Sequence, residues 1–468
     1  MKIHLIAIGG AAMHNLALAL HQNGHAVTGS DDEIYNPALS RLEKSGLLPV
    51  AFGWFPEKIT ADLDVIILGM HARIDNPELI RAQALGLKIY SYPEFIYQHA
   101  KDKKRVVVAG SHGKTSTTSM IMHVLKFYNR DFDYLVGAML EGFDTMVRLS
   151  DAPVMVIEGD EYLASPIDRV PKIHHYKPDV AIITGIAWDH INVFPTYQNY
   201  VEQFEIFIKT INTVDAGNPD KSGEGVLFYY GHDKDLVEIS KKATCRTQAY
   251  VSPDMTMFRR KLMPYQIKDI DGKEVYFGHT KLSVFGEHNL ANLNAAYLAC
   301  RELGVTTEDF FKAISNFKGA AKRLQTLHKT KTSIAFLDFA HAPSKVNATV
   351  KAVSAEYPNR KLLACLELHT FSSLNKAFLP QYAETMNAAD EAIVFFNEHT
   401  LAMKKMPPLS IEEVKAYFQH KNLQVFTDNQ VFKAYLEEKK FDNLNLLLMT
   451  SGTFGGLDLK KIAKDLLK

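Results

Sequence analysis

The chain has few cysteines, no long apolar run and no excess of charge of either sign. Its three cysteines, Cys245, Cys300 and Cys365, show neither a Cys-x-x-Cys pair nor another metal-binding spacing, so we expect structural thiols in a reducing compartment rather than disulfides. Nowhere do eighteen apolar residues follow one another, and the apolar start at residues 2–8 is too short and too interrupted for a signal peptide. The expectation is a cytoplasmic protein without a membrane span.

The charges balance, with 53 basic and 53 acidic side chains among 468 residues. Such a chain creates no overall field that would attract nucleic acid or an anionic membrane, so neither partner is expected. An anionic ligand must therefore be held by local groups. The length exceeds what one hydrophobic core supports, and 47% hydrophobic with 23% charged residues is typical of ordinary globular domains.

A phosphate-binding loop is predicted where the apolar run of residues 106–109 meets a helical segment. Its residues are Gly110, Ser111, His112, Gly113, Lys114, Thr115 and Ser116. The glycines let backbone N–H groups turn inward, and the positive N-terminal end of the following helix favours phosphate. Lys114 would then reach the outer phosphates and Thr115 would bind Mg²⁺. The loop is shorter than the usual pattern, because Val108 stands at the first glycine position, so an ordinary glycine turn is the alternative.

Alternating β-type and helical segments predict an α/β fold in three blocks. The charged run of residues 101–104 is predicted to be a linker, and the polar stretch of residues 326–332 precedes the third block. A segment rich in Gly, Asp and Lys at residues 215–225 is predicted to be a surface loop. We therefore expect domains at residues 1–102, 103–327 and 328–468.

A glycine-containing turn, Gly9, Gly10, Ala11 and Ala12, lies between the β-type run of residues 3–8 and a helix from Met13. Ser30 and Asp31 follow the second β-type run about twenty residues later, as in a dinucleotide-binding fingerprint. Ala7 and Ala12, however, stand at the first and third glycine positions. NAD, a plain strand-to-helix turn, and a nucleotide-sugar diphosphate on the helix N-terminus all remain open.

Carboxylates follow the β-type run of residues 154–157, at Glu158, Asp160 and Glu161. Ligands of open α/β sheets collect at the carboxyl ends of strands, and a carboxylate beside a phosphate cradle suits Mg²⁺. Glu161 is the predicted metal ligand, with a solvated acidic turn as the alternative. His190 follows the next β-type run, although a lone histidine is more often structural and Mg²⁺ prefers oxygen ligands.

Six stretches, in order along nearly the whole chain, resemble the motifs of the Mur ligase family, the ATP-dependent amino acid ligases of peptidoglycan synthesis. They are residues 110–115, 158–162, 189–190, 286–292, 322–324 and 338–343. The short phosphate loop is the form that this family uses. The resemblance implies a Rossmann-like N-terminal domain, a central P-loop ATPase domain and a Rossmann-like C-terminal domain.

The resemblance also implies roles for single residues. Lys114 would hold the β- and γ-phosphates, Thr115 one Mg²⁺, and Glu161 with His190 a second Mg²⁺. Arg323 would stabilise the γ-phosphate as it transfers, which completes a catalytic set of Lys114, Glu161, His190 and Arg323. The remaining ATP contacts would be His288, Asn289 and Asn292 around adenine, Asp338 at the ribose, and His341 facing the site. In the implied reaction, a substrate carboxylate attacks the γ-phosphate and an amine displaces the resulting acyl phosphate.

The N-terminal turn resembles the uridine-diphosphate-binding loop of the members that act on UDP-N-acetylmuramate, which removes NAD as the favoured ligand. Gly9, Gly10, Ala11, Ala12 and Met13 would contact this substrate. Ser30 and Asp31 would lie near the uridine, and His71 near the diphosphate.

Two branches of the family use this acceptor, one adding L-alanine and one attaching the tripeptide L-alanyl-γ-D-glutamyl-meso-diaminopimelate in recycling. Tyr162, residues 174–178 and residues 450–456 resemble the second branch, whereas residues 367–373 lack the arginine expected in the loop that helps to hold the amine. The expected function is the tripeptide ligase, working as a monomer or weak homodimer on small molecules. The alternatives are the L-alanine ligase and, less favoured, a non-catalytic nucleotide sensor; a dehydrogenase would leave the central motifs unexplained.

Overall fold

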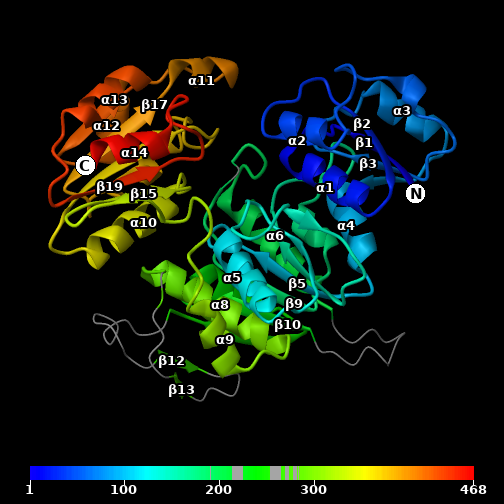
Figure 1. The fold of residues 1–468 in the computed structure, drawn as a ribbon, viewed down its shortest axis with the longest axis horizontal. Coiled ribbons are helices and arrows are strands. Elements are labelled where there is room, and N and C mark those ends of the chain that lie inside the picture. Colours follow the sequence, from blue (N-terminus) through cyan, green and yellow to red (C-terminus); the bar gives the residue numbers. More distant parts are fainter. Residues whose placement is uncertain are drawn as a thin grey trace.

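Three α/β blocks follow one another along the chain, each built on its own sheet. The computed structural model describes residues 1–189, 191–212, 225–252, 265–268, 274–277, 282 and 284–467. The first and third blocks lie on opposite sides above the second block in the view of Figure 1. The predicted α/β class with three successive blocks is confirmed. None of the helices in the described ranges combines the length and the apolarity needed to cross a membrane.

The first block has a four-stranded parallel sheet in the order β2-β1-β3-β4. Its strands are β1 (Lys2–Ile6), β2 (Ala26–Ser30), β3 (Val65–Leu68) and β4 (Ile89–Ser91). Its helices are α1 (Ala11–Gln22), α2 (Ala38–Lys44), α3 (Pro77–Ala84) and α4 (Tyr92–Ala100). Helix α4 begins in a capping box, in which Ser91 and Glu94 bond each other's backbone N–H.

The second block has a seven-stranded sheet in the order β11-β10-β9-β5-β8-β6-β7, with only β7 antiparallel to its neighbour. Its strands are β5 (Lys104–Ala109), β6 (Asp133–Leu135), β7 (Val147–Arg148), β8 (Val154–Glu158), β9 (Val180–Ile183), β10 (Val226–Tyr230) and β11 (Arg246–Tyr250). Its helices are α5 (Lys114–Phe127), α6 (Tyr197–Lys209), α7 (Lys234–Ser240), α8 (Glu287–Glu302) and α9 (Thr307–Ile314). A separate antiparallel pair is formed by β12 (Tyr265–Lys268) and β13 (Glu274–Phe277).

Strand β5 lies in the middle of this sheet, and both of its faces are covered. Val106 and Val108 pack with α5 and α8, whereas Val107 and Ala109 join the core on the opposite face. All four are fully buried, which explains why the strand reads as one continuous apolar run rather than as an alternating pattern.

The third block has a six-stranded sheet in the order β14-β15-β19-β16-β17-β18, in which β14 alone is antiparallel to its neighbour. Its strands are β14 (Gln325–Lys329), β15 (Ile334–Asp338), β16 (Lys361–Leu368), β17 (Glu391–Phe396), β18 (Leu423–Phe426) and β19 (Leu444–Met449). Its helices are α10 (Pro343–Glu356), α11 (Glu398–Met403), α12 (Ile411–Phe418), α13 (Asn429–Glu437) and α14 (Leu459–Leu466).

The polar stretch of residues 326–332 is largely strand, not only linker, because β14 occupies Gln325–Lys329. This strand lies at the edge of the sheet and its side chains are exposed or half-buried, so polar residues fit there. The predicted boundaries after residues 102 and 327 stay predictions, and the second falls within β14. The predicted surface loop of residues 215–225 lies outside the described residues except for Gly225.

The first strand ends earlier than the predicted run of residues 3–8, because Ala7 has a φ of +67°. This left-handed conformation costs a non-glycine residue about 1 kcal/mol or more. The backbone therefore makes the turn that glycine usually makes at this position of a strand-to-helix loop, with alanine in its place.

Arg105 joins the end of the first block to the second. Its side chain is buried, and its guanidinium donates to the carbonyl oxygens of Ala100 and Lys101 at the end of α4. It also donates to the carbonyl of Lys177 at 2.8 Å and lies 3.2 Å from a carboxylate oxygen of Asp179. These bonds tie the linker to the start of β9.

We expect Arg105→Met to lower the melting midpoint by about 5 °C or more in a thermal unfolding experiment. The variant leaves the buried carbonyl of Ala100 and the partly buried carboxylate of Asp179 without their donor, and losing one partner of a buried ion pair costs up to about 3–5 kcal/mol. Arg73→Met is the control, because Arg73 and Asp75 form an exposed ion pair whose loss should shift the midpoint little. Equal shifts in the two variants would contradict the assigned role of Arg105.

Candidate active site

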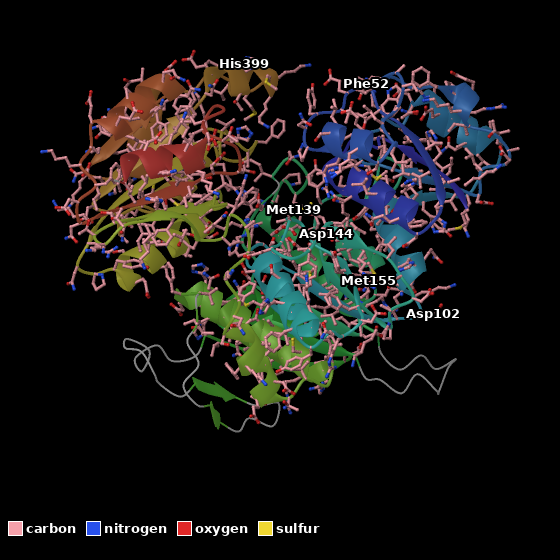
Figure 2. All side chains as sticks on the ribbon, viewed as in Figure 1. Phe52, Asp102, Met139, Asp144, Met155 and His399 are labelled. Atoms are coloured by element: carbon pink, nitrogen blue, oxygen red, sulfur yellow. The ribbon has the colours of Figure 1, made fainter. Side chains whose placement is uncertain are left out.

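A cavity of about 1010 Å³ lies where the three blocks meet. Met139, one of its lining residues, is labelled near the middle of the molecule in Figure 2. The predicted site residues in its wall are Gly10, Ala11, Ala12, Met13, His71, Ser111, His112, Gly113, Lys114, Thr115, Ser116, Glu161, His288, Asn289, Asn292, Arg323, Asp338 and His341. Most of the predicted site residues are thus brought together, from segments far apart in the sequence.

The phosphate loop depends on two glycines with positive φ. Gly110 has a φ of +117°, and a Cβ there would come within 2.5 Å of Thr184 Oγ1. Gly113, at +70°, precedes helix α5, and a Cβ there would collide with the side chain of Asn292. Both positions therefore exclude other residues for conformational and for steric reasons. The prediction of a glycine-dependent turn before a helix is confirmed, whereas its ligand is not tested by this geometry.

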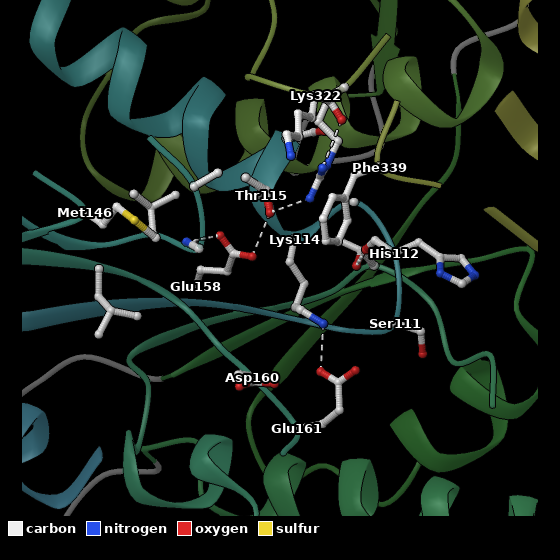
Figure 3. A pocket seen from close by; sticks show the side chains of 18 of the residues that line it. Ser111, His112, Lys114, Thr115, Met146, Glu158, Asp160, Glu161, Lys322 and Phe339 are labelled. Atoms are coloured by element: carbon white, nitrogen blue, oxygen red, sulfur yellow. Dashed lines mark hydrogen bonds and ion pairs between the residues drawn. The ribbon is translucent and has the colours of Figure 1, made fainter. Parts of the chain in front are cut away.

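Lys114 lies at the first position of α5 and points into the cavity (Figure 3). Its Nζ donates to the Gly110 carbonyl at 2.6 Å and to Glu161 Oε2 at 2.7 Å. Burial lowers the pKa of this amine, but Glu161, Asp160 and Glu158 together raise it above its ordinary value. Lys114 is therefore a permanent cation in the wall of the cavity.

Thr115 contacts a carboxylate that the sequence analysis did not single out as its partner. Its hydroxyl donates to Glu158 Oε1 at 2.7 Å, and the backbone N–H of Gly137 donates to Glu158 Oε2 at 2.7 Å (Figure 3). Arg323 donates to the Thr115 hydroxyl at 3.2 Å. Glu158 belonged to the acidic cluster seen in the sequence, but its position in that cluster gave no reason to prefer it to Glu161.

Tyr200, which lies on helix α6, connects the phosphate loop to Glu161. Its hydroxyl lies 2.8 Å from Ser111 Oγ and donates to Glu161 Oε1 at 3.0 Å. The side chain is fully buried, so these bonds are shielded from water. Nothing in the sequence pattern marked Tyr200, since a tyrosine on the apolar face of a helix usually serves only the core.

The third block and the segment that precedes it place several polar residues around the same loop. Ser344 Oγ lies 3.0 Å from His112 Nε2, and burial lowers the pKa of His112 to about 3, so this histidine is neutral. Arg323 lies over the ring of Phe339 with 4.8 Å between the guanidinium carbon and the ring centre. Asp338 accepts hydrogen bonds from the backbone N–H groups of Leu324 and Ala340, both at 2.7 Å.

The predicted adenine residues lie on the first turns of α8. His288 and Asn292 line the cavity, and Asn292 packs directly over Gly113. Asn289 also lines the cavity, and its side-chain amide donates to the Phe285 carbonyl at 2.9 Å. Their contact with adenine stays a prediction.

The N-terminal turn faces the cavity at the switch point of the first sheet. The loops after β1 and β3, which are neighbours in the sheet, supply Gly10 to Met13 and Gly69 to His71 to the wall. Asp31 instead accepts the Gly9 backbone N–H at 2.7 Å, and burial raises its pKa to about 6. Among the described residues, Gly9, Ser30, Asp31 and Gly110 support the loops without lining this cavity, and their contact with a ligand stays a prediction.

Side-chain oxygen atoms that could bind Mg²⁺ are present beside Lys114. The Thr115 hydroxyl and the carboxylates of Glu158 and Glu161 all lie in the cavity wall, and hard oxygen ligands are what Mg²⁺ prefers. The residues present therefore fit the predicted metal. His190 lies outside the described residues, so its place in this set is not described.

We expect the protein to lose stability between pH 7.5 and pH 5, in part through His341. Burial, together with Lys345 and Arg323, lowers the pKa of His341 to about 4, below its usual 6.5. Between these two values the unfolded chain binds a proton that the folded chain does not, so stability falls as the pH falls.

The measurement is the melting midpoint of wild type and His341→Gln at both pH values. The variant should lose about 2 kcal/mol less over this range, which corresponds to a few degrees. An identical pH dependence in the two proteins would contradict the role given to His341.

Two family models match the chain: "Mur ligase family, catalytic domain" at residues 2–104 and "Mur ligase middle domain" at residues 108–300. The UDP-N-acetylmuramate–L-alanyl-gamma-D-glutamyl-meso-2,6-diaminoheptandioate ligase of Haemophilus influenzae is 27% identical, over 100% of this chain and 99% of its own. The UDP-N-acetylmuramate–L-alanine ligase of Caldanaerobacter subterraneus is 31% identical, over 84% of this chain and 82% of its own. The crystal structure of a murein peptide ligase from Psychrobacter arcticus, 21% identical, has the same fold, with a TM-score of 0.66 over 100% of this chain and 98% of that one. The chain therefore belongs to the Mur ligase family, whose members are ATP-dependent ligases that form C–N bonds.

Proposed function

We propose that this Mur ligase joins UDP-N-acetylmuramate to the tripeptide L-alanyl-γ-D-glutamyl-meso-diaminopimelate in peptidoglycan recycling. The reaction uses ATP and passes through an acyl phosphate. The Haemophilus influenzae relative and a relative in Escherichia coli, 26% identical over 98% of this chain, both carry the name of this tripeptide ligase.

One continuous cavity carries this proposal. It joins the N-terminal turn, which suits a nucleotide diphosphate, to the phosphate loop and to the polar residues of the third block. A UDP-sugar bound at the first block would extend its carboxylate toward the γ-phosphate of ATP held at the second. Reactants held in one cavity react as if they were at very high local concentration, which is a large part of what a ligase must achieve.

Lys114 and Arg323 are the proposed electrostatic catalysts. Phosphoryl transfer spreads negative charge over the equatorial oxygens, and cations fixed near them stabilise the transition state. The ion pair with Glu161 and the stacking on Phe339 hold these two cations in place before substrate arrives. His288, Asn289 and Asn292 are proposed to bind adenine, Asp338 the ribose, and His341 to face the reacting groups.

One Mg²⁺ is proposed to be held by Thr115, and a second by Glu161 with His190. When bound, the metal would neutralise charge on the phosphates of ATP. The hydrogen bond between Tyr200 and Glu161 orients the carboxylate, and the Arg323 contact orients the Thr115 hydroxyl. Such supporting bonds are what usually fixes the geometry of metal-binding groups.

The third block is proposed to keep water away from the acyl phosphate. Its residues His341 and Lys345 form part of the cavity wall, and it contacts the phosphate loop through Ser344 and His112. An acyl phosphate exposed to water would hydrolyse before the amine arrives, so a closed arrangement favours ligation.

The tripeptide is the proposed amine donor, and L-alanine is the alternative. Relatives named for the L-alanine reaction reach 31% identity, although over 84% of this chain. In the third block, residues 369–373 and 450–456 follow the neighbouring strands β16 and β19, and Glu367 near the end of β16 holds the second loop by accepting from Thr450 Oγ1 and from the Phe454 N–H. These two loops are the proposed amine-binding region.

We expect phosphate release from ATP with UDP-N-acetylmuramate to require the tripeptide rather than L-alanine. The assay measures phosphate with each amine and identifies the product by mass spectrometry. Turnover with L-alanine but not with the tripeptide would overturn the tripeptide assignment and favour the alternative. No turnover with either amine, together with measurable ATP binding, would instead support a nucleotide sensor.

Lys114→Ala is the control that assigns the activity to this site. We expect its phosphate release to fall at least about 10³-fold, because the cation that contacts the phosphates is lost. A variant that keeps more than a tenth of the wild-type rate would show that another site produces the phosphate.

We also propose that the enzyme acts in the cytoplasm, as a monomer or weak homodimer, on small-molecule substrates only. The balanced charge supports this proposal, since no broad basic surface is expected for nucleic acid or for an anionic membrane. The division into domains at residues 1–102, 103–327 and 328–468 is proposed with it.

A further inference from the structure

Lys345 lines the cavity together with Lys114 and Arg323, and the wall also contains Lys172, which pairs with Asp160, and Lys322. Lys345 lies in the first turn of α10, two residues after Pro343, and its side chain is 22% exposed. It comes from the third block, whereas Lys114 comes from the phosphate loop and Arg323 from the segment between the second and third blocks. Lys114, Arg323 and Lys345 therefore reach one cavity from three different segments.

Lys345 is held less firmly than the other two cations. Lys114 has two contacts at 2.6 and 2.7 Å, and Arg323 is fixed by Thr115 and Phe339. In the part of the chain that the structure describes, Lys345 has one ion-pair partner, Asp189 Oδ2, at 3.6 Å. An ammonium group has three N–H donors, so this contact leaves donor capacity directed at the cavity.

The positive charges around Lys345 favour the binding of an anion. Burial lowers the pKa of Lys345 below its ordinary value; Asp189 and Glu161 oppose this shift, and the positive charges of Lys114 and Arg323 add to it. Lys345 in turn lowers the pKa values of His112 and His341. Placing these three cations around one cavity is costly unless a group with several negative charges lies between them. A phosphoryl group with its equatorial oxygens has that charge and shape.

We propose that Lys345 is a catalytic cation that contacts the oxygens of the transferring phosphoryl group. The inference rests on the proposed ligase function and adds a residue to it. In this step the bond between the γ-phosphorus and the oxygen bridging to ADP breaks, and a bond to the substrate carboxylate oxygen forms. The products are ADP and the acyl phosphate, and Lys345 neither gains nor loses a proton.

The position of Lys345 links the chemistry to the placement of the third block. Its neighbour Ser344 lies 3.0 Å from His112 of the phosphate loop, measured from Oγ to Nε2, so the start of α10 lies directly against this loop. If α10 moved away, the cavity would lose the Lys345 charge together with that contact. The cation set is complete only when the third block lies against the second, which restricts phosphoryl transfer to the closed arrangement.

The experiment compares full-length wild type with Lys345→Met, Lys345→Arg and Lys351→Met. Lys351 is an exposed lysine on the same helix, so its variant controls for changes in α10 and in net charge. Three quantities are measured: kcat for phosphate release at saturating substrates, the affinity for a non-hydrolysable ATP analogue, and the melting midpoint. Oxygen-isotope exchange within ATP, with UDP-N-acetylmuramate and without amine, reports acyl phosphate formation directly.

We expect Lys345→Met to lower kcat and the isotope exchange by about 10²-fold, the usual effect of removing one charge-stabilising donor. The affinity for the ATP analogue should change less than about threefold, because the contact strengthens only in the transition state. Lys345→Arg should recover at least a tenth of the wild-type kcat, and Lys351→Met should match wild type.

Two outcomes would overturn the assignment. If Lys345→Met keeps kcat and isotope exchange within threefold of wild type, Lys345 does not contact the transferring group. If Lys345→Met and Lys345→Arg lose activity and melting temperature equally, Lys345 has a structural role. Failure of the ligase proposal itself is recognised separately, since wild type would then release no phosphate with either amine.

Discussion

A buried ion pair between Lys114 and Glu161 is the constraint on which the rest of this site depends. The two side chains are only 16% and 1% exposed, and a charge left unpaired at such depth would cost several kcal/mol. The pair forms only if the loop after β5 and the loop after β8 hold a fixed distance, and Tyr200 adds helix α6 to the same arrangement. Gly110 and Gly113 make this possible, because a Cβ at either position would force the loop away from its neighbours.

The cavity exists because parallel sheets collect functional loops at the carboxyl ends of their strands. In the first and second sheets the loops that line it follow neighbouring strands, β1 with β3 and β5 with β8. The third sheet contributes Asp338 and Phe339 at the end of β15. Arg105 anchors the first block to the second through hydrogen bonds of its buried guanidinium, so the N-terminal turn and the phosphate loop are held at a defined spacing.

Local sequence signals predicted the backbone conformation of the phosphate loop, but they did not identify the side chains that contact it. Glycines before a Lys-Thr pair, between an apolar run and a helix, point to one backbone conformation, and the structure has it. Glu158 was visible in an acidic cluster, but only the end of β8 decides that its carboxylate meets Thr115 while Glu161 meets Lys114. No sequence signal predicted the contact of Tyr200, because its hydroxyl meets Ser111, 89 positions away in the sequence, only through tertiary packing.

The sequence by itself determined the α/β class, the three successive blocks, the turn around Gly110 and Gly113, and the resemblance to the Mur ligases. These follow from periodicity, from glycine's conformational freedom and from short ordered motifs, all of which act over a few neighbouring residues. The tertiary structure alone decided that Ala7 makes a turn usually left to glycine, that β14 occupies part of a polar stretch, and that Lys345 joins the cavity. Those outcomes depend on contacts between distant segments, and the free energy of such contacts is set by packing and charge in three dimensions.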